Sequence, residues 1–448
     1  PELHVSREYT NMMKGYKEAK DKSKSQKDAV MFIKQKLDAA KWFIEAIKQR
    51  QQTLFVTMSS IMHYQKDYFL TGDERKLRPM ILKDIAEEID GVGGIINAYT
   101  SHEYTCYFTR SLPEDGELSL EILYDMMANS LLDKGEIEKE KKVILEEINM
   151  YEDEPHSFII EEFTKGMYKG SPLGYSILGE KKLVKKVTRE LLIQYFRQNY
   201  RPENMIIVIT GAFQENLIEQ VKTSFGNLTS MGLEALPEEP SNQSVHFDMK
   251  VFERDNVNQI YFVMGMPGFG KTHSNFYKLL ILNTILGGSP SSHLFQEVRE
   301  KLSLCYDIGS YASGFRDAGE LIISGGSNQE NFPTALKEIH RILSELKSNG
   351  ISKEEFERGR KQIKSHLVMS AESAKNIMFK VASAYIYHDV YKGTAHTVAI
   401  LDKIQYEEFN QFVKDYLPLK ELSVCLLGPK GTNRMKKVWK EINEQTSR

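Results

Sequence analysis

An internal repeat limits the folds that this chain of 448 residues can adopt. Residues 196–202 (FRQNYRP) are followed by an apolar run that ends at Gly211. The same order recurs at residues 412–418 (FVKDYLP), where the apolar run ends at Gly428. A helix that leads into a strand therefore occurs twice, as in a chain with two related domains. We expect an α+β fold, in which two related domains each combine an antiparallel sheet with helices.

The two copies differ in how they begin. The second copy opens with a strand at residues 259–264 and a helix at about residues 275–286, before a further helix that starts at Ser292. The first copy lacks this opening, because the helix that starts near Asp84 follows a helical stretch of a different kind. We therefore expect the first domain to be truncated by about one strand and one helix.

The preceding stretch, residues 1–83, is predicted to form an all-α helical bundle. From Ser25 to about Leu70, apolar residues recur at spacings of three and four, the period of a helix with one apolar face. Residues 1–86 carry 17 Lys and Arg against 11 Asp and Glu, a net charge of +6. The whole chain has a net charge of −3, so the remainder carries −9. This asymmetry indicates a basic module joined to an acidic one, with the join at residues 77–91.

Beyond the join, the pattern changes to that of a sheet with helices. Residues 95–100 and 104–109 are predicted strands, and the second alternates between two faces. A long acidic helix begins after Asp133, which forms an Asp-x-x-Glu capping pattern with Glu136. The apolar residues 205–210 are predicted to form a further strand.

Membrane and secretory signals are lacking in the sequence. No apolar run approaches the 18 or more residues of a membrane span, and the first residues have no signal-peptide h-region. Cys106, Cys305 and Cys425 lie far apart in apolar, strand-like settings, which favours reduced core thiols over a disulfide framework. We expect a cytoplasmic protein that does not insert into a membrane.

Residues 265–272 (GMPGFGKT) match the phosphate-binding pattern GxxxxGK[ST]. A phosphate site of this kind needs a helix that begins at the Lys, so that backbone N–H groups point at the phosphates. Here polar residues 272–275 separate Lys271 from the next apolar helix, and no parallel βαβ series surrounds it. We expect no nucleotide site.

Two glutamates on the acidic helix form a second candidate site. Glu140 and Glu147 are seven residues apart, so they lie on one face of the helix with Ile144 between them. From the residues alone, such a pair is more often part of a solvated face than a metal site.

The chain from residue 84 to about residue 430 resembles the pitrilysin/insulinase family of zinc peptidases, of the mitochondrial-processing-peptidase-like kind. The motifs that carry the resemblance are residues 93–101 (GGIINAYTS), 138–148 (EKEKKVILEEI), 171–179 (SPLGYSILG), 200–205 (YRPENM) and 286–302 (LGGSPSSHLFQEVREKL). In that family two His and a Glu of an HxxEH motif supply two zinc ligands and the general base, and a downstream Glu completes the site.

The resemblance makes Glu147 the residual metal ligand and Glu140 the carboxylate that supports it. None of the eleven His lies in an HxxEH or HExxH arrangement, and helical residues occupy the expected place upstream of Lys83. His63, the nearest His before the join, stands alone on a predicted helix. Zinc hydrolysis needs three protein ligands and an activated water. We therefore expect no catalytic residues and no stably bound zinc, although zinc is the cofactor of the family, so whether the chain is an enzyme stays open.

Residues for binding a substrate are better retained. The resemblance places Asn97, Ala98 and Tyr99 on an edge strand that holds extended peptides by β-augmentation. It also gives Arg299 and Tyr306 the role of an Arg/Tyr pair that contacts the substrate.

Residues 1–87 resemble the core-binding domain of sigma-54 transcription factors, a bacterial family. The matching motifs are residues 2–9 (ELHVSREY), 32–44 (FIKQKLDAAKWFI), 46–50 (AIKQR) and 69–73 (FLTGD). The resemblance implies binding of core RNA polymerase through residues 1–83. No recognition helix follows Glu88, so specific DNA binding is not expected.

These observations predict a chimera with four parts. They are a sigma-54-like fragment (1–83), a truncated first peptidase-like domain (84–228), a linker (229–250) and a second peptidase-like domain (251–448). The preferred function is an inactive peptidase homologue that binds extended peptides, acts with an active peptidase subunit or forms a homodimer. The alternatives are a transcription-associated protein that binds RNA polymerase, and a recombination product without a joint function.

Overall fold

The structure is a computed structural model of the chain. It describes residues 94–228, 244–417, 419 and 422–446. The chain divides after Gly91 into two units, and all described residues belong to the second unit. The predicted bundle at residues 1–83, with His63, lies outside the described residues, as does most of the predicted linker at residues 229–250. The domain boundaries therefore stay predictions. Within the described part, no helix is long and apolar enough to cross a membrane.

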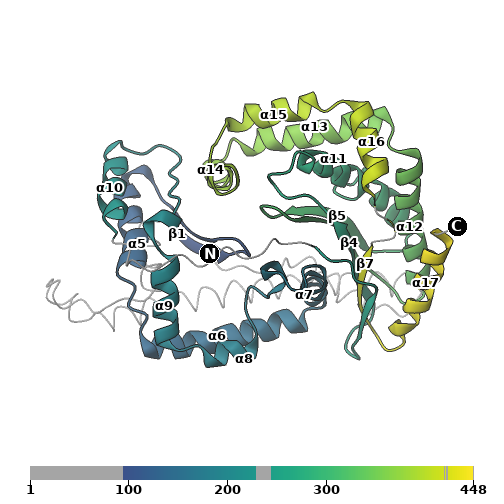
Figure 1. Cartoon of the computed structure of the whole chain (residues 1–448), viewed down its shortest axis with the longest axis horizontal. Helices are drawn as coiled ribbons and strands as arrows, with labels where there is room; N and C mark the ends of the chain where they lie inside the picture. Colours follow the sequence, from purple (N-terminus) through teal and green to yellow (C-terminus); the bar gives the residue numbers. More distant parts are fainter. Residues whose placement is uncertain (1–93, 229–243, 418, 420–421, 447–448) are drawn as a thin grey trace, which may run out of the picture. The chain divides into compact units, whose positions relative to one another are not determined.

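Residues 94–228, here called the first half, begin with an antiparallel hairpin (Figure 1). Its strands are β1 (Ile95–Thr100) and β2 (Thr105–Arg110), which confirms both predicted strands. The helices that follow are α5 (Gly116–Ala128), α6 (Lys134–Asp153), α7 (Pro155–Met167), α8 (Lys181–Lys186), α9 (Arg189–Asn199) and α10 (Asn216–Ser224). Short 3-10 helices are η2 (Pro113–Asp115), η3 (Pro172–Gly174), η4 (Pro202–Asn204) and η5 (Phe225–Asn227).

Residues 244–446, the second half, contain a five-stranded sheet with the order β3-β7-β4-β6-β5. The strands are β3 (Lys250–Glu253), β4 (Ile260–Pro267), β5 (Asp307–Gly314), β6 (Gly319–Ser327) and β7 (Ser423–Gly428). All neighbours are antiparallel except β3 and β7, which pair in parallel. The other elements are α11 (Phe276–Leu286), η6 (a π-helix, Leu294–Lys301), α12 (Phe332–Asn349), α13 (Lys353–Ser370), α14 (Ala374–His388), α15 (Gly393–Lys403), α16 (Tyr406–Tyr416), η8 (Thr432–Arg434) and α17 (Met435–Thr446).

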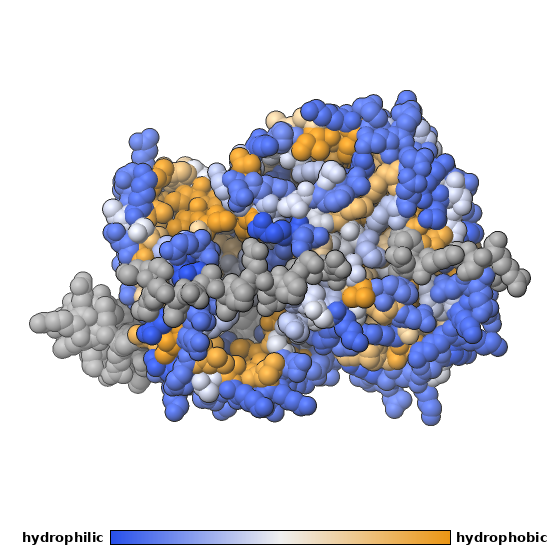
Figure 2. Space-filling model, viewed as in Figure 1, coloured by the Kyte–Doolittle hydropathy of each residue, from blue (hydrophilic) through white to orange (hydrophobic). Residues whose placement is uncertain are grey.

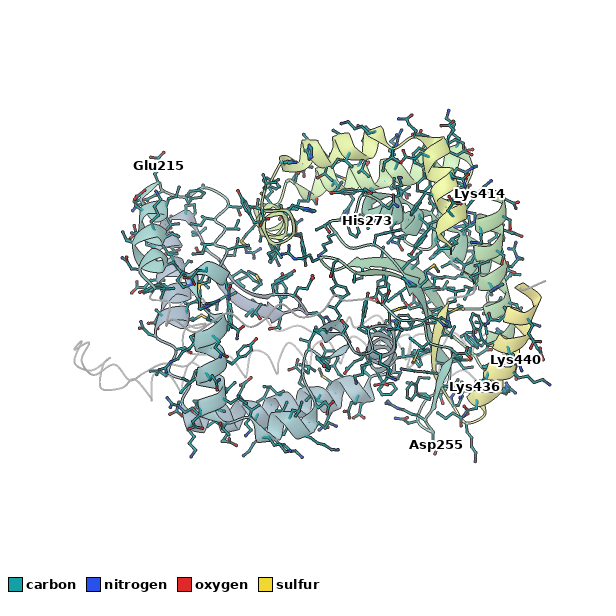
Figure 3. All side chains as sticks on the ribbon, in the orientation of Figure 1. Glu215, Asp255, His273, Lys414, Lys436 and Lys440 are labelled. Carbon is teal, nitrogen blue, oxygen red and sulfur yellow. The ribbon has the colours of Figure 1, made fainter. Side chains whose placement is uncertain are left out.

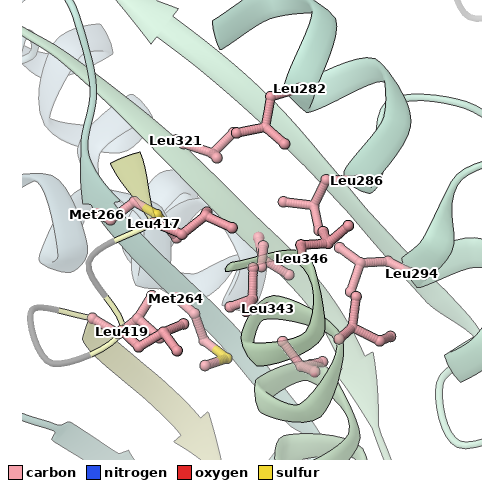
Figure 4. Packing of buried hydrophobic residues seen from close by; sticks show 14 of the residues in the cluster. Met264, Met266, Leu282, Leu286, Leu294, Leu321, Leu343, Leu346, Leu417 and Leu419 are labelled. Atoms are coloured by element: carbon pink, nitrogen blue, oxygen red, sulfur yellow. The ribbon is translucent and has the colours of Figure 1, made fainter. Parts of the chain in front are cut away.

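Side chains alternate along β4, and both faces of that strand are buried. Phe262, Met264 and Met266 point into a large apolar cluster formed with α11, α12, α16 and α17 (Figure 4). Val263 points to the opposite face. This arrangement explains why β4 has an almost continuous apolar sequence, which is typical of a central strand covered on both sides.

Helix α7 of the first half covers that opposite face. Phe163 and Met167 are fully buried and belong to the same cluster as Val263, Ile322 and Leu427 of the second-half sheet. Gly265 provides the space for this packing, because a Cβ there would lie 2.4 Å from Cζ of Phe163. The sheet is thus one layer between helices of the second half and a helix of the first.

The structure contains the repeated helix in both halves, as α9 and α16. The strand that was expected after it forms only in the second half, as β7. In the second half, α16 leads to β7, which pairs with β4 and β3. In the first half, α9 leads to residues 205–210, which were expected to form a strand and are not assigned to one. A strand requires a hydrogen-bonding neighbour, and no described strand of the first half plays the part of β4. Ile206 and Ile207 remain 47% and 40% exposed as a result, and Figure 2 shows apolar side chains gathered on the surface of this half.

Candidate functional site

Helix α6 presents Glu140 and Glu147 as the sequence predicts. The side chain of Asp133 accepts hydrogen bonds from the N–H groups of Gly135 (2.7 Å) and Glu136 (3.1 Å), which fixes the start of the helix. Glu140 is exposed and Glu147 is half-buried. Neither carboxylate makes an ion pair or a side-chain hydrogen bond within the described part of the chain.

These two residues do not form a metal site by themselves. Among the described residues, no group of three His, Cys, Asp or Glu side chains is arranged to hold a metal ion. A zinc site needs three or four protein ligands. The donor set that the structure describes therefore does not fit zinc, and no catalytic step can be derived through that metal.

Strand β1 carries the three residues that were predicted to bind a peptide. Asn97, Ala98 and Tyr99 lie opposite Phe108, Tyr107 and Cys106 of β2. The N–H of Ala98 donates to Oδ1 of Asn97 (2.7 Å), so this donor is directed away from the β1–β2 ladder. In the described part of the chain no strand pairs with the other edge of β1.

The face of the hairpin that carries Asn97 and Tyr99 lies against α14 of the second half. The ring of Phe379 lies 6.1 Å from the ring of Tyr99 and 5.4 Å from that of Phe108. The hydroxyl groups of Tyr99 and Tyr104 are 3.4 Å apart. Burial, reinforced by Tyr104, raises the pKa of Tyr99, which therefore stays a neutral hydroxyl at physiological pH.

Arg299 and Tyr306 lie close together. Arg299 is on the π-helix η6, whose Leu294 and Val298 are fully buried and anchor it to the core. The guanidinium carbon lies 4.5 Å from the ring centre of Phe295 and 5.9 Å from that of Tyr306. Tyr306 is 87% exposed, directly before β5. The structure thus brings these two residues together as a pair of a half-buried cation and an exposed aromatic ring.

A polar cluster that sequence reasoning missed holds the turn between β1 and β2. Oε1 of Glu103 accepts the N–H of Arg316 (2.7 Å), and Oε2 accepts the hydroxyl of Tyr387 (2.7 Å). The Arg316 guanidinium also donates to the carbonyl of Ile386. The partners of Glu103 lie 213 and 284 residues away, so no local pattern could reveal them.

Lys271 belongs to the same cluster, which explains its place in the GxxxxGK pattern. Its ammonium lies 4.0 Å from the ring centre of Tyr387, a cation–π contact. Burial lowers the pKa of Lys271, and the charge of Glu103 opposes that effect. The next helix, α11, begins only at Phe276.

Backbone donors of this loop are also engaged. The N–H groups of Gly268 and Lys271 donate to the carbonyls of Gly319 and Phe315, each at 2.7 Å. The N–H of His273, labelled in Figure 3, donates to Gly270 (3.0 Å). A phosphate would need such N–H groups free and converging on it. The loop therefore matches the sequence pattern of a phosphate site but does not have its geometry.

Three family models match the chain. The model described as "Insulinase (Peptidase family M16)" matches residues 78–181, and "Peptidase M16 inactive domain" matches residues 186–363. A third model, "Sigma-54, DNA binding domain", matches residues 30–105 and so overlaps the first. It describes the DNA-binding domain, whereas the sequence motifs favoured the core-binding domain. The last residues of this match, 94–105, form β1 and the turn after it.

Curated relatives carry the word protease in their names. A Bacillus subtilis protein named "Uncharacterized zinc protease YmxG" is 32% identical over 374 residues, which cover 84% of this chain and 89% of the relative. An "Uncharacterized zinc protease" of Rickettsia bellii is 31% identical over 327 residues, covering 72% of this chain and 77% of the relative.

Solved structures share the fold. A protease from Helicobacter pylori aligns with a TM-score of 0.73 at 21% identity, covering 79% of this chain and 86% of that one. A peptidase M16 inactive domain from Pseudomonas fluorescens gives 0.71 at 18% identity, covering 77% and 84%. Fold and matches together define a protein of the two-domain peptidase type. The chain belongs to the insulinase family, peptidase family M16.

Proposed function

We propose that this chain is a peptidase-family protein that binds extended peptides and does not hydrolyse them by itself. The observation that carries the proposal is the isolation of Glu147. No HxxEH or HExxH arrangement occurs in the sequence, and no described side chains complete a three-ligand group around this carboxylate. Peptide hydrolysis on zinc needs those ligands and an activated water. Three free cysteines are in keeping with a reducing, cytoplasmic location.

A zinc and cleavage assay tests the inactive part of the proposal. The purified full chain is analysed for bound zinc and incubated with quenched fluorescent peptides, with and without a chelator. We expect substoichiometric zinc and no cleavage above background. Stoichiometric zinc together with chelator-sensitive cleavage would refute inactivity.

Peptide binding is proposed to occur at the outer edge of β1. The exposed strand directs the N–H of Ala98 outward, where a peptide carbonyl would replace Oδ1 of Asn97 as its acceptor, as β-augmentation requires. Pro at this position would remove the donor, and an edge strand tolerates Pro.

Fluorescence anisotropy with a labelled, unstructured peptide tests this edge. Ala98→Pro should weaken binding about tenfold, the loss of roughly 1.4 kcal/mol. Ala98→Ser keeps the N–H and should bind as the parent chain does. Equal binding by both variants would show that the peptide does not use this edge.

Arg299 and Tyr306 support a role beside an active subunit. A half-buried guanidinium next to an exposed aromatic ring suits a peptide carbonyl or carboxylate, which would compete with Glu300 at 3.7 Å from Arg299. We propose that the chain offers this pair to a peptide held by an active family member, or in a homodimer. Mixing the chain with such an enzyme should raise its cleavage rate, and Arg299→Ala should abolish the increase. No change in rate on mixing would contradict the proposal.

Association with core RNA polymerase is a second candidate, favoured by the match to a sigma-54 model over residues 30–105. We propose that residues 1–83 would carry it, without promoter recognition, since residues 94–105 form a strand and a turn. A pull-down of purified core polymerase with the full chain tests it, and the absence of polymerase from the eluate would dispose of it.

A further inference from the structure

A cluster of cations lies on the surface of the second half, near the end of the chain. Residues 430–440 contain four Lys, one Arg and no Asp or Glu, a net charge of +5. They form the turn after β7, the short helix η8 and the first turns of α17. All five cationic side chains are exposed, and Figure 3 labels two of them on α17. We call Lys430, Arg434, Lys436, Lys437 and Lys440 the α17 cation cluster.

The internal repeat shows that the fold does not require cations at this position. Gly211 and Gly428 end the two corresponding apolar runs, and helices α10 and α17 follow them. The eleven residues at the same distance after Gly211, residues 213–223, carry two Glu and one Lys, a net charge of −1. The helix dipole favours acidic side chains in the first turn, where α10 has Glu219 and α17 has none. The cations of α17 therefore lie where helix stability does not favour them.

Hydrogen bonds fix the backbone that carries the cluster. Oε1 of Glu253, on β3, accepts the N–H groups of Gly431 (3.0 Å) and Asn433 (2.8 Å). Glu253 thus satisfies donors at the start of η8, and its charge also interacts with Lys430. The guanidinium of Arg434 donates to the carbonyl of Gln329 (3.2 Å), which is an uncharged partner.

Most of the positive charge of the cluster has no carboxylate beside it. Lys436 and Lys437 make no ion pair with any residue that the structure describes, and Lys440 lies as far as 3.9 Å from Glu444. Residues 1–86 of the same chain carry a net charge of +6, so the cluster repels them. The partner that suits this surface is therefore an anion outside the basic N-terminal segment.

Anionic partners differ in what they need besides charge. A membrane surface or a protein interface also uses exposed apolar side chains, but Met435, Trp439 and Ile442 of α17 are only 1%, 2% and 4% exposed. Single-stranded nucleic acid stacks on exposed aromatic rings, and Trp439 is the one aromatic residue in the sequence of η8 and α17. A nucleic acid duplex needs only cations, because its phosphates carry about one charge per 1.7 Å of axis.

We propose that the α17 cation cluster binds the phosphate backbone of a nucleic acid duplex without reading its sequence. Lys436 and Lys440 are about one turn apart, or roughly 6 Å along the helix, so both face the same stretch of backbone. Phosphate contacts position a duplex and select no base. The expected dissociation constant is that of non-specific binding, about 10⁻⁴–10⁻⁶ M at physiological salt. The proposal uses second-half residues alone, so it depends neither on peptide binding at β1 nor on residues 1–83.

Fluorescence anisotropy measures binding of the full chain to a fluorescein-labelled DNA duplex of mixed sequence and about 20 base pairs, over a series of salt concentrations. The cluster variant combines Lys436→Gln, Lys437→Gln and Lys440→Gln. It should bind about tenfold more weakly at low salt. The slope of log affinity against log salt should also become shallower by roughly 2–3, since each lost phosphate contact removes about one unit.

The matched control removes three other exposed cations, on α12 and α13, by combining Lys337→Gln, Lys353→Gln and Lys361→Gln. It makes the same change in net charge. It should keep the salt slope of the parent chain and its affinity within about threefold. Circular dichroism confirms that both triple variants keep their helix content.

Hydrogen exchange locates the contact, because residues 1–86 also carry cations that attract a duplex. We expect the duplex to slow exchange in residues 430–441 of the parent chain and not of the cluster variant. Equal weakening in the two triple variants, an unchanged salt slope in the cluster variant, or no protection of residues 430–441 would overturn the proposal. So would tighter binding to phosphatidylglycerol vesicles or to the single strand than to the duplex, since the partner would then be a membrane surface or unpaired nucleic acid.

Discussion

At the scale of single residues, the buried carboxyl of Glu320 is the group with the clearest energetic consequence. It lies on β6 with 5% of its surface exposed. The carboxyl group lies beside the buried hydroxyl of Tyr168. Burial raises the pKa of Glu320 from 4.5 to about 7, and the nearby Tyr168 hydroxyl offsets part of the rise. The folded state thus holds a proton that the unfolded state releases at lower pH.

We predict that Glu320→Gln stabilises the protein at alkaline pH. Because the folded pKa is raised, the free energy of unfolding of the parent chain falls as the pH rises from about 4.5, and the loss is complete above about 7. Gln cannot ionise, so the variant should gain roughly 3 kcal/mol over the parent at pH 8 and little at pH 4. Denaturant unfolding at the two pH values measures the difference. Glu215→Gln, at the exposed residue labelled in Figure 3, is the control and should show no such dependence.

At the scale of elements, residues 205–210 show how a strand sequence can fail to form a strand. Their apolar, β-branched character suits a sheet, and their counterpart β7 pairs on both sides. In the described part of the first half, the partner strand is lacking. Among the described strands, none pairs with the backbone donors and acceptors of this segment, so they have the character of an edge.

We predict that this edge promotes self-association. Ile207→Lys places a charge on a side chain that is 40% exposed, so it should reduce light scattering at high protein concentration with little change in the free energy of unfolding. Leu183→Lys, on the exposed helix α8, is the matched control. Unchanged scattering for Ile207→Lys, or an equal decrease for Leu183→Lys, would argue against association through this edge.

At the scale of the whole molecule, contacts of two kinds, apolar and polar, join the halves of the described unit. One is the apolar packing of α7 on the second-half sheet, where Phe163 meets Gly265. The other is polar and links Glu103 of the hairpin turn to Arg316 and Tyr387. The face of helix α7 that is buried therefore packs on a sheet whose strands begin about a hundred residues later in the chain.

We predict that Gly265→Ala lowers the free energy of unfolding by about 1–3 kcal/mol, because the added Cβ overlaps the Phe163 ring. Phe163→Leu removes the ring atoms that the new Cβ would meet. The double variant of Gly265→Ala with Phe163→Leu should therefore recover part of the lost free energy of unfolding. Hydrogen exchange should rise in α7 and β4 together, since each buries the other. Gly226→Ala, where no atom lies within 4 Å of the new Cβ, is the control. A double variant no more stable than Gly265→Ala would contradict this contact.

The sequence by itself determined the features that depend on neighbours along the chain. The cap at Asp133, the strands β1 and β2, and the repeated order of helix and apolar run all follow from local spacing, and the structure has the cap, both strands and the helix before each run. The resemblance to the peptidase family and the lack of an HxxEH motif were likewise visible in the residues.

The tertiary structure decided the features that depend on partners far away in the chain. Residues 205–210 do not form a strand. Lys271 contacts the ring of Tyr387 rather than lying in a phosphate site. The hydrogen-bond partners of Glu103 are more than 200 residues distant. The physical reason is the same in each case. Helical and capping bonds close within one turn, whereas sheet pairing, burial and charge compensation are contributed by whichever segments the fold brings together.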